Sequence, residues 1–223
     1  MKSLLTGLAA AAIGLAPLAA LAQNEAAAEL GQAGSKAAGW TSCKFSITEA
    51  VEGGKKGSDP EEGTYDKAKG LYTKSGTSQS VTVAGKRAST RRDGTWRARA
   101  RPEPIESPSS FLEDLDKNLK TVTRTEEGGA KVYSGALTAA GAAYLLSGLE
   151  SRLRGQGESK ITARVTVDGD GNVSKIEIEG TFTGKIQGQD ANVKLSRVIT
   201  FSDVNKATLE IPEEAQKALD QLP

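Results

Sequence analysis

The stretch that decides the fold opens with Ile161-Thr162-Ala163-Arg164-Val165-Thr166-Val167-Asp168-Gly169-Asp170-Gly171-Asn172-Val173 and continues to Ile211. Apolar residues occupy every second position, and two clusters interrupt them, Asp168 to Asn172 and Gln187 to Asp190. Such alternation between clusters of Gly, Asp and Asn is typical of antiparallel strands with one buried face and one wet face. The stretch therefore predicts a meander of four strands, the last of them Ala207 to Ile211.

The first half of the chain carries the same signal in shorter pieces. The Asp93-Gly94 pair predicts a hairpin, because both of its residues tolerate the positive φ of a tight turn. The strands expected before the final meander are Trp40–Val51, Thr64–Lys67, Leu71–Ser75, Ser80–Ala84, Lys86–Arg92, Thr95–Arg101, Val122–Thr125 and Lys131–Leu137.

Two mid-chain segments predict helices, near residues 109–120 and 138–154. Ser110 and Glu113 have the spacing of a capping box, in which each side chain bonds the other residue's backbone N–H. Thr138 is the expected cap of the second helix. A further short helix is expected at the C-terminus, from Pro212 to Leu219.

The N-terminus has the pattern of an export signal. Lys2 precedes the apolar run Leu4 to Leu18, and Ala20-Leu21-Ala22 fits the small-x-small rule for cleavage. The rival interpretation is a membrane anchor, for which the apolar run is short. We expect residues 1–22 to be a signal peptide, and the mature chain to have no transmembrane segment and to lie in the periplasm or outside the cell. The residue at the cleavage point is Gln23 and not a cysteine, which excludes the bacterial lipoprotein route.

The mature chain would consist of a lead-in and one domain. Residues 23–39 are rich in Ala and Glu, which favour helix, while Gly31 and Gly34 are expected to interrupt it, so this part is either a short helix or a frayed lead-in. Residues 40–223 contain no repeat and no interior linker, which indicates a single domain.

Composition excludes several classes of function. Of 29 Lys and Arg residues only Lys2 leaves with the signal, so 28 remain against 28 Asp and Glu, and the neutral chain has no overall attraction to nucleic acid. The chain has no His, and Cys43 is its one cysteine, which we expect to be buried rather than paired with another chain. We therefore expect no enzyme, no metal and no cofactor. Asp168 to Asn172 resembles the start of a calcium loop, but its flanking strands favour a plain hairpin turn.

One strand presents a basic face. Arg97 and Arg99 alternate with Trp96 and Ala98, and Arg91 lies on the preceding strand. This face is either an ordinary solvated surface or a docking site for an anionic partner such as an envelope protein or a lipid headgroup.

Two charged residues break the apolar phase of their strands. Glu49 shares the phase of Phe45 and Ile47, and we expect it at the rim of the sheet, in reach of water. Arg197 shares the phase of Ile199, so it either points inward to a partner or to a polar group of a ligand, or is turned outward by a bulge.

The order of these elements, with Asp93-Gly94-Thr95-Trp96 before the helices and Val193 to Val204 running toward Ile211-Pro212 after them, resembles the LolA and LppX/LprG group of envelope lipoprotein and lipid carriers. The resemblance implies an α+β fold in which a strongly curved antiparallel sheet, an incomplete β-barrel, is covered by the two mid-chain helices. It also implies that acyl chains bind between sheet and helices.

If that resemblance holds, the expected cavity residues are Phe45, Ile47, Val83, Trp96, Phe111, Leu115, Leu145, Leu149, Ile176, Ile178 and Phe182, with Arg197 as a polar member. The same residues would also alternate if they packed on one another as an ordinary core. Two non-carrier interpretations stay open as well: an envelope interaction protein that binds its partner through Arg91, Arg97 and Arg99, and a hydrolase of unfamiliar type.

Overall fold

The computed structural model of the protein describes residues 16–52, 59–138, 141, 156–186 and 189–222. The helices are α1 (Ala16–Ala38), the 3-10 turn η1 (Ser110–Leu112), α2 (Leu115–Asn118) and α4 (Glu213–Asp220). The strands are β1 (Ser42–Glu52), β2 (Glu61–Asp66), β3 (Gly70–Ser75), β4 (Ser78–Val83), β5 (Lys86–Thr90), β6 (Trp96–Ala100), β7 (Leu119–Glu127), β8 (Ala130–Leu137), β9 (Gln156–Val167), β10 (Val173–Ile186) and β11 (Gln189–Ser202).

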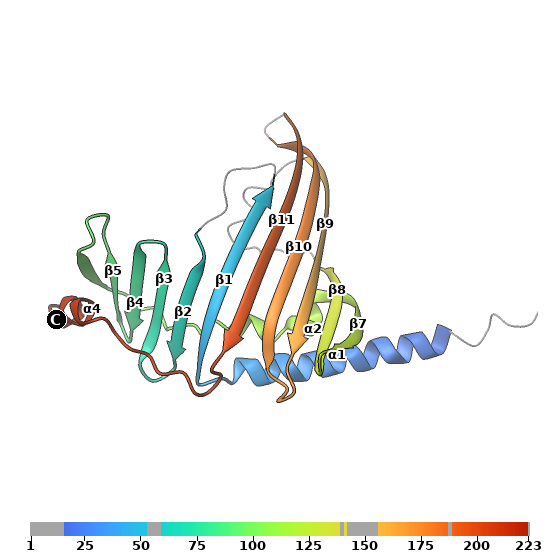
Figure 1. Ribbon diagram of the computed structural model, residues 1–223, viewed down its shortest axis with the longest axis horizontal. Helices are drawn as coiled ribbons and strands as arrows, with labels where there is room; N and C mark the ends of the chain where they lie inside the picture. The colour runs from blue at the N-terminus through green and yellow to red at the C-terminus, as the bar shows by residue number, and fades with distance from the viewer. Residues whose placement is uncertain (1–15, 53–58, 139–140, 142–155, 187–188, 223) are drawn as a thin grey trace, which may run out of the picture.

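All eleven strands belong to one antiparallel sheet, in the order β6-β5-β4-β3-β2-β1-β11-β10-β9-β8-β7. The first strand, β1, lies at the centre of the sheet, and β2 to β6 follow it one by one to one edge. The chain then crosses to the other edge, from which β7 to β11 return to the centre, where β11 pairs with β1. In the described part of the chain β6 and β7 are not paired with each other, so the curved sheet stays open (Figure 1). The expectation of a curved, incompletely closed antiparallel sheet is confirmed.

Helix α1 lies along one end of the sheet, beside β7 and β8 (Figure 1). It buries Ala26, Leu30, Ala33 and Ala37, which recur at helical spacing, against the main core. We call the sheet face that joins this core the inner face and the opposite one the outer face.

The helix continues through both of its glycines, so the expected interruption at Gly31 and Gly34 is wrong. A Cβ on Gly34 would lie 2.1 Å from the carbonyl oxygen of Leu112, and one on Gly31 would lie 3.2 Å from the carboxylate of Asp116. These positions lack a side chain because η1 and α2 pack directly onto the helix there.

The mid-chain helix expected near residues 109–120 is two short turns, η1 and α2, and the predicted capping box is absent. The buried Ser109 hydroxyl instead donates a hydrogen bond to the carbonyl of Ala37, 2.8 Å away, which ties this segment to the end of α1. At the second predicted helix, the Thr138 hydroxyl accepts a bond from the Gly141 amide. The rest of that helix, residues 142–155, lies outside the described residues.

The predicted fourth strand of the final meander is wrong, because residues 207–211 form no strand. β11 lies between β1 and β10, so neither of its edges can take a hairpin partner. The chain turns away at Asp203 and Asn205, both with positive φ, and the Asn205 side chain accepts hydrogen bonds from Thr41. Ala207 and Leu209 are still buried, which explains the alternation.

The two hairpins expected at glycine-rich turns are confirmed. Asp93 accepts hydrogen bonds from the amide and hydroxyl of Thr95 in the turn between β5 and β6. Asp168 accepts bonds from the amides of Asp170 and Asn172 between β9 and β10, so the amides of the turn hold this carboxylate in place.

Candidate ligand-binding cavity

A cavity of about 590 Å³ lies between the inner face of the sheet and the segment that crosses from β6 to β7. We call residues 101–118 the crossover segment. The cavity is lined by Phe45, Ile47, Glu61, Leu71, Thr73, Thr82, Arg197, Ile199 and Phe201 from the sheet, and by Arg101, Ile105, Glu106, Ser107, Pro108, Ser110 and Phe111 from the crossover segment.

Strand register assembles the apolar floor of the cavity. Phe45 on β1 lies directly opposite Phe201 on β11, and Ile47 lies opposite Ile199. Gly63 on β2 is the next neighbour of Phe45, and a Cβ there would lie 2.2 Å from the Phe45 ring. The missing side chain therefore gives that ring its place in the floor. Phe111 packs over Phe201 with 6.4 Å between the ring centroids, so the crossover segment forms the opposite wall.

The floor ends at a paired charge. Glu49 and Arg197 lie opposite each other in the β1–β11 register, and the Arg197 Nε is 3.4 Å from the Glu49 carboxylate. Their side chains are only 17% and 13% exposed. The structure thus shows that Arg197 points inward, and that Glu49, expected at the rim in reach of water, is mostly covered and paired with Arg197. Partly buried charges of opposite sign in adjacent strands stabilise each other. This pairing explains why β1 and β11 each have one charged residue at a position where the alternation calls for an apolar one.

Glu61 on β2 is the third charged group of the floor. It pairs with Ile47 in the register and lines the cavity. Burial raises the pKa of the Glu61 carboxyl, and the nearby Glu49 raises it further, while Arg197 and Arg87 oppose the shift. The apolar stretch of the floor therefore ends at a group of three charged side chains, Glu49, Arg197 and Glu61.

The structure brings four of the predicted cavity residues together in the lining: Phe45, Ile47, Phe111 and Arg197. Leu115, Ile176 and Ile178 are fully buried in the main core beside it, and Phe182 is also buried. Leu145 and Leu149 lie outside the described residues.

Val83 and Trp96 lie on the outer face, away from the cavity. They pack with Val81 and Ala88 around Ala215 and Leu219 of α4, which covers this end of the sheet. The Lys86 ammonium group holds the end of that helix by donating to the Leu222 carbonyl, 2.6 Å away. Trp96 and the arginines do lie on opposite faces of β6, as predicted. The apolar face of β6 is the outer face, which packs on α4, and the arginines lie on the inner face, on the same side of the sheet as the cavity.

Several lining residues were not expected. Ile199 and Phe201 share the phase of Arg197, so alternation alone could have indicated them. Ile105 and Arg101 belong to a proline-rich crossover without any period, and no local signal marks them as part of a cavity.

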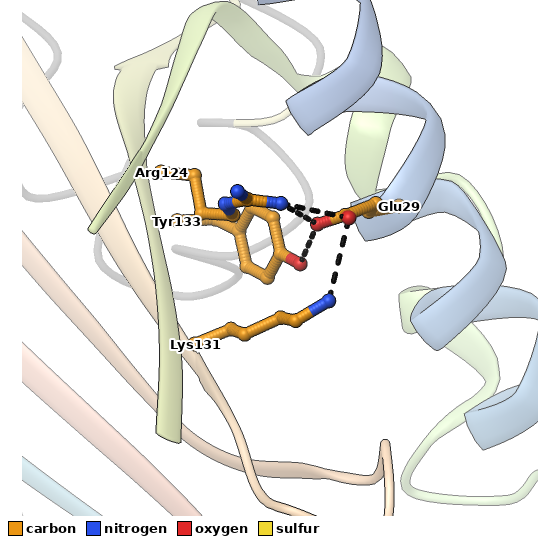
Figure 2. A network of polar contacts seen from close by, with 4 residues as sticks. All are labelled: Glu29, Arg124, Lys131 and Tyr133. Atoms are coloured by element: carbon orange, nitrogen blue, oxygen red, sulfur yellow. Dashed lines mark hydrogen bonds and ion pairs between the residues drawn. The ribbon is translucent and has the colours of Figure 1, made fainter. Parts of the chain in front are cut away.

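A separate cluster of polar residues fixes α1 to the sheet edge. Figure 2 shows Glu29 of α1 facing Arg124 of β7 and Lys131 and Tyr133 of β8. The Glu29 carboxylate accepts bonds from Arg124 at 2.8 and 2.9 Å, from Tyr133 at 2.7 Å and from Lys131 at 3.3 Å. These donors, Tyr133 foremost, lower the pKa of the Glu29 carboxyl to about 2. The cluster positions the helix that closes one end of the core.

Cys43 is fully buried at the base of β1, as expected. Burial raises the pKa of its thiol to about 12, which removes its nucleophilic form at neutral pH. Among the residues that the structure describes, no helix is both long enough and apolar enough to cross a bilayer.

Comparison with known proteins gives a match in structure. The fold resembles the crystal structure of LprF from Mycobacterium bovis, with a TM-score of 0.52 and 17% identity over 86% of this chain and 98% of that one. A LolA superfamily protein from Nitrosomonas europaea is also matched, at 7% identity over 81% of this chain and 94% of that one, with a TM-score of 0.29. No family model matches the sequence, and no curated protein matches it. The chain thus shares its fold with LprF, which confirms, at the level of the fold, the resemblance that its order of elements indicated.

Proposed function

We propose that this protein is an exported, non-enzymatic carrier that holds a lipid or an acylated molecule in the cavity under the crossover segment. The observation that carries this proposal is the cavity itself. Its volume of about 590 Å³ lies within the range of small-molecule sites, and most of its floor is apolar.

The physics of the lining suits an acyl chain. Phe45, Ile199 and Phe201 offer apolar surface from the sheet, and Ile105 and Phe111 offer it from the crossover segment. Each methylene transferred from water to such a surface contributes roughly 0.8 kcal/mol, which must exceed the cost of immobilising the ligand. Two features support a lining of defined shape: the absence of a side chain at Gly63, which leaves room for the Phe45 ring, and the Glu49–Arg197 pair.

The packing of α1 supports export. Residues 21–25 are exposed, and Ala26 is the first buried residue among those of the helix whose burial the structure describes. Cleavage after Ala22 would therefore remove no residue that the described core needs, and Glu29 would stay in the mature protein. The periplasm or the extracellular space is the compartment that this proposal implies.

Native mass spectrometry of the protein purified from its own envelope without detergent tests the carrier function. We expect a discrete added mass that organic solvent extracts as an acylated molecule. The Thr73→Trp variant places a large side chain in the cavity floor and should remove this mass. Thr48→Trp makes the same change at an exposed position on the opposite face of β1 and should leave it.

An equal ligand load in the two variants would show that the ligand binds elsewhere. An absence of ligand from the wild-type protein, even after incubation with diacyl lipids, would identify the cavity as a packing defect of an ordinary core and overturn the proposal.

A further inference from the structure

The arginines of β5 and β6 lie at one side of the cavity, and we define Arg87, Arg97, Arg99 and Arg101 as the basic edge. Arg101 lines the cavity directly. Arg87 lies opposite the cavity residue Thr82 in the β4–β5 register, and Arg99 lies opposite Arg87 in the β5–β6 register. Arg99 is therefore two strand spacings from the lining, each about 4.8 Å, on the same face of the sheet.

The second row of the register repeats this arrangement. Thr73, also a cavity residue, pairs with Ser80, which pairs with Ser89, which pairs with Arg97. Each row therefore leads from the cavity floor to an arginine on the edge strand β6. The first row passes through Arg87, and the second passes through Ser80 and Ser89.

The basic edge has few local counter-charges. Within the described part of the chain, the ion pairs include neither Arg87, Arg97 nor Arg99, and Arg101 meets only the exposed Glu103, at 3.5 Å. The Arg87 Nε donates to the Ser80 hydroxyl, 2.9 Å away, which orients the guanidinium. Burial lowers the pKa of Arg87, and the nearby Arg101 and Arg99 add to this effect, so these like charges stand close enough to repel.

Three acidic residues lie around the cavity and the basic edge. Glu61 is in the floor, where burial raises its pKa, and Glu103 and Glu106 are exposed on the crossover segment. Glu61 faces the Glu49–Arg197 pair from β2, and Arg99 and Arg97 extend beyond it on the edge strand. The positive charge is thus displaced toward β5 and β6.

From this arrangement we infer that the cargo is an amphiphile with an anionic phosphate headgroup, whose acyl part occupies the cavity and whose phosphate binds at the basic edge. Guanidinium groups present paired N–H donors that match phosphate oxygens, and a phosphate would relieve the repulsion between Arg87, Arg99 and Arg101. The inference rests on the proposed carrier function and specifies the class of its ligand.

Two lipids with the same acyl chains separate headgroup recognition from chain burial: dioleoylphosphatidic acid, and dioleoylglycerol, which lacks the phosphate. The full mature chain is delipidated, loaded with each, and its occupancy measured by native mass spectrometry over a range of lipid concentrations. We expect the phosphatidic acid to bind at least about tenfold more tightly, since a charge-assisted hydrogen bond is worth about that factor. The preference should shrink in high salt.

The variants identify the residues responsible. R99Q changes an exposed side chain and should reduce the preference, and R87Q/R99Q should abolish it. R92Q removes the same charge in the β5–β6 turn, about 16 Å along the strand from Arg87, and should leave the preference intact.

The outcomes distinguish the two proposals. Equal binding of both lipids to the wild-type protein, or a preference that survives in R87Q/R99Q, would overturn the headgroup inference and leave the carrier function standing. Binding of neither lipid would overturn both. If T73W kept full affinity for the phosphatidic acid, the arginines would attract anions at the surface only, and the inference would be wrong.

Discussion

Replacing Glu29 by Gln should destabilise the protein, because this carboxylate joins α1 to β7 and β8. It accepts bonds from Arg124, Lys131 and Tyr133, and its pKa is lowered from 4.5 to about 2. At about 1.4 kcal/mol per pKa unit, the full shift corresponds to roughly 3 kcal/mol. The Glu29 side chain is 24% exposed and that of Arg124 is 36% exposed, so solvent screening reduces the expected loss to about 1–2 kcal/mol.

The pH dependence of this contribution has a definite sign. A carboxyl with a lowered pKa stabilises the folded state above the pKa of the unfolded chain, 4.5 for Glu29, and the contribution disappears as the pH falls toward about 2. Wild type and E29Q should therefore differ most at neutral pH, and the difference in their free energies of unfolding should decrease steadily below pH 4.5.

Urea denaturation at pH 7, 4 and 3 measures both effects. E25Q is the matched control, since Glu25 lies one helical turn earlier on α1 and is exposed. Both variants remove one negative charge from α1, so the difference between their free energies of unfolding reports the contacts of Glu29 and not the change in net charge. The reasoning is refuted if E29Q and E25Q have equal stability at pH 7, or if the difference between wild type and E29Q does not depend on pH.

Three further changes test the packing. G34A should cost about 2 kcal/mol or more in urea denaturation, because its Cβ would lie 2.1 Å from a backbone oxygen, whereas G39A, with 3.4 Å to the nearest atom, should be nearly neutral. With a thiol pKa near 12, Cys43 should react with a disulfide reagent at pH 8 about a thousandfold more slowly in the native than in the unfolded protein, and fast native labelling would contradict its burial. L219A should cost about 2–3 kcal/mol and shift the fluorescence of Trp96 to longer wavelength; an unchanged spectrum would show that α4 does not cover that ring.

Alternation predicted the strands well because it reports a local fact, namely that one face of each strand is buried. The paired runs of β9, β10 and β11 and the turns at Asp93 and Asp168 could be placed from it, since a hairpin needs only neighbouring residues and a turn that tolerates positive φ. The same signal failed at residues 207–211, where alternate side chains are buried without any strand partner. Whether a strand forms there depends on free edges of the sheet, which is a property of the whole fold.

The faces of the strands could not be assigned from the sequence either. Trp96 and Ala98 form an apolar side that α4 covers from the outer face, so an apolar side did not imply the cavity side. Local propensity predicts that Gly31 and Gly34 break the helix, although their role is to let the crossover segment approach α1. In both cases the deciding contact comes from a segment more than 70 residues away, and no periodicity in the local sequence records it.

The topology explains why a cavity lies where it does and how a ligand would be oriented in it. The first meander ends at β6 and the second begins at β7, on opposite edges, so the crossover segment has to span the width of the sheet. It does so over the inner face, where its residues line the cavity together with those of β1 and β11. Along these strands the apolar floor extends only from the Phe45–Phe201 pair to the Glu49–Arg197 pair, about 13 Å.

Across the strands the floor is longer. Lining residues continue from β11 through β1, β2 and β3 to Thr82 on β4, which is four strand spacings or about 19 Å, and the basic edge follows on β5 and β6. An acyl chain that avoids the buried ion pair must therefore lie across the strands. In that orientation one end of the chain lies toward Arg87 and Arg99, so the direction of the floor is compatible with the headgroup site inferred from the arginines.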